Sequence, residues 1–128
     1  MHLDEKIGAR LKARGDTVGI AESSTGGLIS AALLSVGGAS AYFRGGSVIY
    51  TAYARSAFMD IPHPLPPPLE RASTEPYASL LAERLRAQLQ SPSGLGETST
   101  AAPPAHSYRD PSPHPALLTP GRHPHLAL

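Results

Sequence analysis

The sequence predicts one α/β domain with a parallel sheet, followed by a tail that has no core of its own. Two short β-branched stretches, residues 17–21 and 47–51, are separated by an apolar helical stretch at residues 26–35. Strands joined through a helix of this length are most economically parallel neighbours, with both carboxyl ends at one edge of the sheet. By contrast, residues 91–128 hold eight of the 14 prolines and no valine, isoleucine, phenylalanine or methionine, which predicts disorder. We therefore expect the domain to occupy residues 1–90.

The first residues predict an amphipathic helix at 4–14. Ile7 and Leu11 lie one helical turn apart among charged neighbours, which is the pattern of a helix with one buried face. Asp4 is available as a cap, and Gly15 lies just past the end.

The next segments complete a strand-helix-strand unit. Residues 17–21 are short, β-branched and bounded by turn residues, as expected of a strand buried on both faces. The helix at 26–35 is apolar nearly all round, so it should be covered on most sides. Two glycines at 45–46 predict a break before the second strand at 47–51.

Two further helices are predicted after this unit. Residues 52–59 favour a short helix, and residues 73–90 favour a longer one with Ser73 as its cap and Pro76 in the tolerated first turn. The proline-rich residues 61–68 between them favour an extended path. That path is either a stiff surface connection or a ligand for a proline-binding domain.

Composition and charge exclude several classes of function. The net charge is +1 with histidines neutral, and the basic residues form no run, so nothing indicates binding to nucleic acid or to an acidic membrane. The absence of cysteine excludes disulfides, thiolate zinc sites and a cysteine nucleophile. No signal-peptide core is present, and no apolar run approaches the roughly 18 residues that span a bilayer. We therefore expect a soluble, cytoplasmic protein.

The six histidines do not predict a metal site. Five of them have proline-rich surroundings, and their spacing fits neither a helix face nor a zinc knuckle. These five are His63, His106, His114, His123 and His125.

The stretch best suited to hold a ligand is the junction between the first strand and the second helix. There Ser23, Ser24 and Thr25 are followed by Gly26 and Gly27. Such a turn leaves backbone N–H groups free, lets a ligand approach closely and faces the positive end of a helix dipole. A phosphate or a carboxylate suits such a point. The alternative is that the hydroxyl residues only cap the helix.

Three ordered segments, residues 21–27, 38–43 and 45–50, resemble the C-terminal domain of the competence/damage-inducible protein CinA. Stand-alone members of that family are nicotinamide-nucleotide amidases. The resemblance spans about residues 5 to 98. It implies a layered α/β/α domain that hydrolyses the carboxamide of nicotinamide mononucleotide. The products would be nicotinic acid mononucleotide and ammonia, with no metal or cofactor.

The resemblance also implies roles for individual residues. Ser23 matches the family's serine nucleophile, Tyr50 lies beside it at a strand end, and Arg55 stands where the family has a lysine proposed to activate the serine. A lysine can accept the serine proton when burial lowers its pKa, whereas arginine stays protonated. Arg55 could still bind the phosphate or stabilise an oxyanion. The positions that match substrate-binding residues are Glu22, Ser24, Thr25, Gly26, Gly27 and Gly46.

A second departure from the family follows the last predicted helix. Residues 94–98 resemble the end of the strand that leads into the family's second glycine-rich loop, but residues 99–104 do not continue that loop. No later segment offers the remaining strands or a closing helix, so we expect an incomplete sheet. We interpret the change after Thr98 as a frameshift, an alternative exon or a mispredicted gene end.

These departures predict a domain with residual nucleotide affinity and weak or absent amidase activity. The rival interpretation is a non-catalytic protein whose core binds a phosphorylated metabolite or a partner subunit. An incomplete sheet leaves a strand edge unpaired, which would favour a homo-oligomer.

Overall fold

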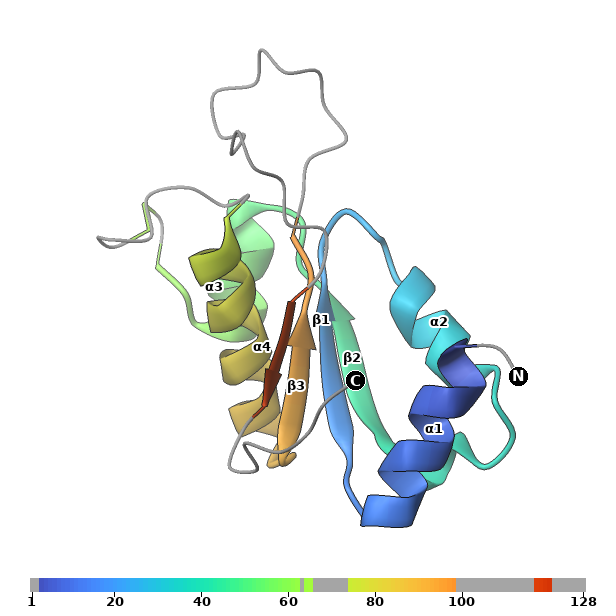
Figure 1. The fold of residues 1–128 in the computed structure, drawn as a ribbon. Helices are drawn as coiled ribbons and strands as arrows, with labels where there is room; N and C mark the ends of the chain where they lie inside the picture. Colours follow the sequence, from blue (N-terminus) through green and yellow to red (C-terminus); the bar gives the residue numbers. More distant parts are fainter. Residues whose placement is uncertain (1–2, 63, 66–73, 99–116, 121–128) are drawn as a thin grey trace.

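A computed structural model of the chain describes residues 3–62, 64–65, 74–98 and 117–120. Its elements follow in the order shown in Figure 1. They are α1 (Leu3–Arg14), β1 (Val18–Glu22), α2 (Leu28–Leu34), the 3₁₀ turn η1 (Ala39–Ala41), β2 (Phe43–Val48), α3 (Ala52–Met59), α4 (Glu75–Leu89), β3 (Ser93–Gly96) and β4 (Leu117–Pro120).

The sheet has the strand order β2-β1-β3-β4. β1 pairs in parallel with β2 and with β3, while β4 runs antiparallel to β3. Ala21 lies opposite Ser47 on one side and Gly96 on the other, so three strands end at the same edge of the sheet. The predicted parallel pairing of the first two strands is confirmed.

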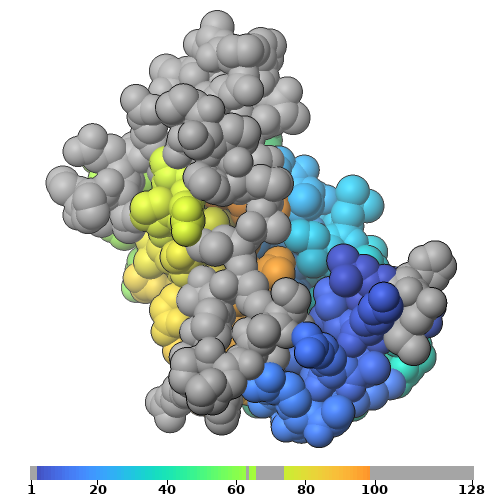
Figure 2. All heavy atoms as spheres, in the orientation of Figure 1, coloured from blue at the N-terminus to red at the C-terminus, as the bar shows by residue number. Residues whose placement is uncertain are grey.

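Helices cover both faces of the sheet, as the predicted α/β/α layering requires. α1 and α2 contact each other on one face, and α2 packs on β1 and β2. α4 packs on β1, β2 and β3 from the other face, with α3 against it. Figures 1 and 2 show α1 and α2, in blue and cyan, on one side and α4, in yellow, on the other.

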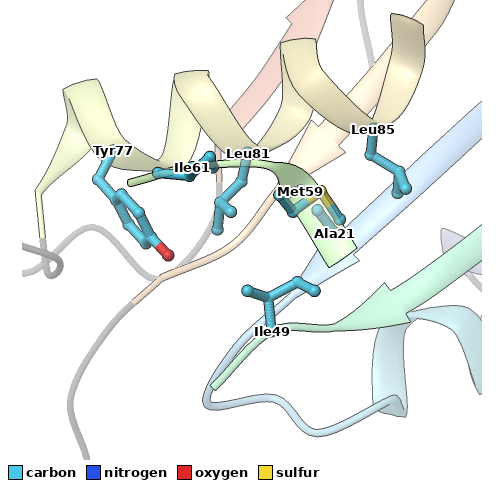
Figure 3. Close-up of a cluster of buried hydrophobic side chains, with 7 residues drawn as sticks. All are labelled: Ala21, Ile49, Met59, Ile61, Tyr77, Leu81 and Leu85. Atoms are coloured by element: carbon cyan, nitrogen blue, oxygen red, sulfur yellow. The ribbon is translucent and has the colours of Figure 1, made fainter. Parts of the chain in front are cut away.

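Each face of the sheet has its own apolar core. The larger one fills the space between the sheet, α3 and α4, and Figure 3 shows its side chains pointing toward one another. Truncating one of its fully buried leucines should cost about 2–5 kcal/mol. This core consists of Ala21, Ile49, Met59, Ile61, Tyr77, Leu81 and Leu85. The core on the other face consists of Leu11, Val18, Ile20, Leu33, Ala39 and Tyr42.

β3 lies unusually close to α4 because two of its four residues are glycine. A Cβ atom at Gly94 or Gly96 would collide with the backbone carbonyls of Ala82 and Ala78 in α4. Glycine permits this approach of helix and strand backbones. The short strand is therefore held by backbone proximity and by its pairing with β1.

The boundary predicted at residue 90 does not end the folded part of the chain. β3 and β4 both lie within residues 91–128, where the composition indicated that no core could form. β3 adds little apolar side-chain volume, so composition does not reveal it. Residues 99–116 and 121–128, which include the four tail histidines, lie outside the described residues, as do His63 and residues 66–68 of the proline-rich segment.

The predicted second strand differs from the structure around its pair of glycines. The second strand begins at Phe43 and not at residue 47, and Gly45 and Gly46 lie inside it. A Cβ atom at Gly45 would lie 3.1 Å from Leu89, and one at Gly46 would lie 2.5 Å from the Ser30 hydroxyl. These glycines therefore make room for α4 and α2 and do not break the strand.

The expectation that the second helix is covered on most sides is wrong. α2 is only seven residues long, and its one buried residue is Leu33. Leu28 and Leu34 are 73% and 53% exposed. α1 and the sheet contact a single face of this helix, and its apolar composition does not reveal which face.

Two predicted caps also differ. Asp4 lies in the first turn of α1, where its Oδ1 accepts a hydrogen bond from the Glu5 N–H. The hydroxyl of Thr74 caps α4 by accepting from the N–H of Tyr77 at 3.3 Å, whereas Ser73 lies outside the described residues.

None of the described helices is long and apolar enough to cross a membrane. No group of three or more histidine, cysteine, aspartate or glutamate side chains in the described part of the chain could hold a metal ion.

Candidate functional site

The loop of residues 23–27, here called the serine loop, connects the end of β1 to α2. The N–H of Gly26 donates to the Ser23 carbonyl at 3.2 Å, and the N–H of Leu28 donates to the Thr25 carbonyl at 3.1 Å. Gly26 and Gly27 have positive φ angles of 61° and 101°, which glycine adopts without strain. The loop is therefore a pair of consecutive tight turns at the carboxyl edge of the sheet.

The carboxylate of Glu22 caps α2. Its Oε1 accepts hydrogen bonds from the N–H groups of Gly27 and Ile29 at 3.1 and 3.0 Å. Its Oε2 accepts from the N–H of Ser30 at 2.8 Å. Glu22 is fully buried. The positive end of the helix, predicted to face a ligand, is thus satisfied by a side chain of the same chain.

These contacts also set the charge of Glu22. Burial alone would raise the pKa of its carboxyl group, because it disfavours the charged form. Hydrogen bonds from the Thr25 hydroxyl and from Ser30 and Ile29 outweigh burial and hold the pKa below the ordinary value. Glu22 is therefore ionised at neutral pH, as a cap at a helix N-terminus should be.

A second buried carboxylate, Glu97, binds the first half of the serine loop. It follows β3 and is fully buried. Its Oε1 accepts from the N–H groups of Ser23 and Thr25 at 2.7 and 3.0 Å. Its Oε2 accepts from the Ser24 hydroxyl at 2.6 Å.

The hydroxyl of Thr25 lies between the two carboxylates. Its oxygen is 2.7 Å from Oε1 of Glu22 and 2.6 Å from Oε1 of Glu97. A threonine hydroxyl has one hydrogen and can donate it in only one direction at a time. Thr25 therefore joins the two carboxyl groups into a single network.

The structure places the predicted catalytic residues in different environments. Ser23 is nearly buried at the end of β1, with 9% of its surface exposed. The N–H of Ile49 donates to the Glu22 carbonyl at 2.7 Å, so the backbones of Ser23 and Tyr50 continue from neighbouring strand ends. The side chain of Tyr50 points to solvent and the residue is 71% exposed.

Arg55 lies on α3 with its guanidinium carbon 5.5 Å from the centre of the Tyr77 ring. It is 8% exposed. Arg55 therefore connects α3 to α4, on the opposite face of the sheet from α2. Burial raises the pKa of the Tyr77 hydroxyl, against the opposing effect of the positive charge of Arg55.

The predicted substrate-binding residues form two groups. Glu22, Ser24 and Thr25 lie in the hydrogen-bond network, and Gly26 and Gly27 shape its turns. Gly46 lies in β2 under Ser30, so its lack of a side chain serves the packing of α2.

Sequence reasoning did not identify Glu97 as a site residue. It lies 74 positions from Ser23 and only the pairing of β1 with β3 brings the two together. The available signal was an acidic residue directly after a strand that ends at the same edge as a loop of three hydroxyl residues.

A cavity of about 680 Å³ lies elsewhere, between α1, α2 and the sheet, and no residue of the serine loop lines it. Its walls are apolar except for Asp4. They comprise Leu3, Ile7, Leu11, Val18, Ile20, Leu28, Ile29, Ala32, Leu33 and Leu95.

Comparison with known proteins gives one consistent family. A CinA-like protein of Anaeromyxobacter is 40% identical over 115 residues, which is 88% of this chain and 28% of the relative. A competence-damage inducible protein of Geobacillus kaustophilus is 44% identical over 94 residues, which is 73% of this chain and 22% of the relative. The chain thus spans about a quarter of the length of these relatives.

Solved structures show the same fold. The competence or damage-inducible protein of Enterobacter asburiae has a TM-score of 0.73 and 25% identity, over 82% of this chain and 65% of that chain. The competence/damage inducible protein of Agrobacterium tumefaciens has a TM-score of 0.70 and 23% identity, over 95% of this chain and 88% of that chain.

The sequence pattern of the CinA C-terminal domain matches residues 1–112. The match therefore continues past Thr98, into the segment where the second glycine-rich loop was expected. The layered fold, which the solved structures share, agrees with this result. The chain belongs to the CinA C-terminal domain family.

Proposed function

We propose that this chain binds nicotinamide mononucleotide and hydrolyses its carboxamide only weakly, giving nicotinic acid mononucleotide and ammonia. The observation that carries the proposal is the position of Ser23. It lies in a hydrogen-bonded loop where three parallel strands end, and it is the residue that resembles the family's nucleophile. Ligands of open α/β sheets bind outside the carboxyl ends of the strands.

Besides the substrate, the proposed reaction consumes only water. The Ser23 oxygen bonds to the carboxamide carbon, and the hydroxyl proton passes to the departing nitrogen. The C–N bond then breaks and the nitrogen leaves as ammonia after it gains a proton. Water cleaves the resulting ester and restores the serine.

The weak turnover follows from Arg55. An arginine side chain stays protonated at any physiological pH and cannot accept the serine proton. Arg55 also lies against the Tyr77 ring, a contact that stabilises a cation in place. The positive charge at this position could stabilise developing negative charge, but the proton acceptor of the family is missing.

The alternative proposal is a non-catalytic nucleotide-binding or protein-binding domain. The contacts of the serine loop favour the protein-binding form of this alternative. The N–H groups of Ser23 and Thr25 already donate to Glu97, and that of Gly27 donates to Glu22. These donors would otherwise be the natural ligands of a phosphate.

The deciding experiment measures ammonia release from nicotinamide mononucleotide by the purified chain, with Ser23→Ala as the matched variant. We expect slow release that disappears in Ser23→Ala. Turnover comparable with that of an ordinary amidase would contradict the claim of weak activity. Release that persists in Ser23→Ala would exclude Ser23 as the nucleophile.

Calorimetric titration with nicotinamide mononucleotide separates the two proposals further. Binding without hydrolysis supports the non-catalytic nucleotide-binding domain. The absence of both leaves only an interaction with another protein.

A further inference from the structure

We propose that Glu97 is a positioning residue for Ser23, because its carboxylate fixes the first half of the serine loop to the end of β3. The part of this inference that concerns turnover rests on the proposed function. The part that concerns the loop rests on the geometry of Glu97 alone.

The contacts of Glu97 are concentrated on three consecutive residues. Its two oxygens accept from the N–H groups of Ser23 and Thr25 and from the hydroxyls of Ser24 and Thr25, all within 3.0 Å. One side chain thus holds every residue from 23 to 25.

Glu97 is itself firmly anchored. Its N–H donates to the Ala21 carbonyl at 2.9 Å, which extends the ladder between β1 and β3 by one residue. The residue is fully buried, so packing restricts its side chain. A group attached to a strand holds a site more accurately than one attached to a loop.

Both peptide groups that flank Ser23 are restrained as a result. Its N–H donates to Glu97, and its carbonyl accepts from Gly26 at 3.2 Å. The backbone angles of Ser23 are therefore fixed, and with them the direction of its Cα–Cβ bond. Displacement of a reacting group by about 1 Å can reduce a rate by about a hundredfold.

A purely structural role does not account for Glu97 equally well. Glu22 already satisfies the first amides of α2, those of Gly27, Ile29 and Ser30. Glu97 contacts none of these three groups and serves only residues 23–25. The backbone N–H groups of residues 23 and 25 therefore donate to Glu97, and those of residues 27, 29 and 30 donate to Glu22. The proposed nucleophile lies in the part that Glu97 binds.

The first test uses the full chain with Glu97→Ala and Glu97→Gln and follows amide hydrogen exchange by NMR. Alanine removes all four contacts. Glutamine keeps a carbonyl oxygen for the two amides and can donate from its nitrogen to the Ser24 oxygen. The amides of Gly27 and Ile29, which donate to Glu22, are the internal control.

We expect exchange at Ser23 and Thr25 to become at least about tenfold faster in Glu97→Ala while the control amides change little, and we expect Glu97→Gln to resemble wild type. Unchanged exchange at Ser23 and Thr25 in Glu97→Ala would overturn the proposal. Equal acceleration at all four amides would also overturn it, because the effect would then be general destabilisation.

The second test separates kcat from KM in ammonia release from nicotinamide mononucleotide. We expect Glu97→Ala to lower kcat about tenfold or more with little change in KM, and Glu97→Gln to restore it. A loss confined to KM would overturn the positioning role. If the wild-type chain releases no ammonia, the proposed function fails, and the exchange measurement still decides whether Glu97 fixes the loop.

Discussion

Glu97 accepts a 2.7 Å hydrogen bond from the backbone N–H of Ser23, which joins the ends of β3 and β1 through a buried side chain. The contact adds to the backbone pairing of the two strands. It makes the carboxyl edge of the sheet a single hydrogen-bonded unit.

Thr25→Val should destabilise the chain by about 1–3 kcal/mol, because it removes the hydroxyl that both buried carboxylates contact. Thr25→Ser keeps the hydroxyl and is the matched control. Urea unfolding measures both free energies. Equal losses in the two variants would mean that the methyl group of Thr25, and not its hydroxyl, matters for stability.

Glu22 should make stability depend on pH in the acid range. Its pKa is lower in the folded chain than the ordinary value of 4.5. A carboxyl group with a lowered folded pKa contributes stability above its unfolded pKa, and that contribution disappears as the pH falls through the folded value. The difference in free energy of unfolding between wild type and Glu22→Gln should therefore be constant at neutral pH and shrink below about pH 4.5.

Glu83 provides the control for this measurement. A hydrogen bond from Arg86 lowers the pKa of Glu83 as well, but half of its side chain is exposed. Exposed ion pairs contribute about 0–1 kcal/mol. The free energy of unfolding of Glu83→Gln should therefore depend on pH almost as that of wild type does. If its pH dependence differed from wild type as much as that of Glu22→Gln, the effect would not be specific to the loop.

Gly96→Ala should destabilise the chain by several kcal/mol or prevent folding, because the added Cβ would collide with the Ala78 carbonyl in α4. Gly37→Ala is the control, since a Cβ there meets nothing within 4 Å. Thermal unfolding of the two variants gives the comparison. A Gly96→Ala chain as stable as Gly37→Ala would show that α4 shifts easily over β3.

Arg55→Lys should increase ammonia release from nicotinamide mononucleotide, because a buried amine can lose its proton and accept that of the serine. General base catalysis typically contributes about a hundredfold or more. Arg55→Met, which has no ionisable group, is the control. Equal rates in the lysine and methionine variants would exclude position 55 as the source of a base.

The sequence predicted those parts of the fold that depend on local pattern. The apolar spacing of Ile7 and Leu11 marked α1, and the β-branched residues of 17–21 marked β1 as a buried strand, which all five residues of Val18–Glu22 confirm. The order of these segments was sufficient to predict that β1 and β2 pair in parallel, because one helix links them.

Local pattern failed where glycine lies inside a strand. Gly45 and Gly46 were interpreted as a break. Composition placed the segment that contains Gly94 and Gly96 in the tail, where only the family resemblance indicated the end of a strand. In both strands the missing side chain makes room for a helix: Gly45 makes room for the distant α4, and Gly94 and Gly96 make room for the same helix, which directly precedes β3. The requirement for glycine exists only after the helix has packed.

The candidate site was also predicted only in part, because some of its contacts form only when distant segments have packed. The hydroxyl and glycine residues from Ser23 to Gly27 are adjacent in sequence and mark a loop at a helix start. In the structure this loop binds the carboxyl groups of Glu22 and Glu97. Glu97 could not be found from local pattern, because the register of β1 with β3 decides where it lies.

The separation of 74 residues between Ser23 and Glu97 has a consequence for the order of folding. α4 and β3 are joined by a short connection and can associate early, whereas β1 and β3 must close a long intervening loop before they pair. Since Glu97 reaches the serine loop only after that closure, the loop should acquire its final shape among the last steps of folding. An intermediate that already contains the α4–β3 unit should therefore leave residues 23–25 open to proteolysis.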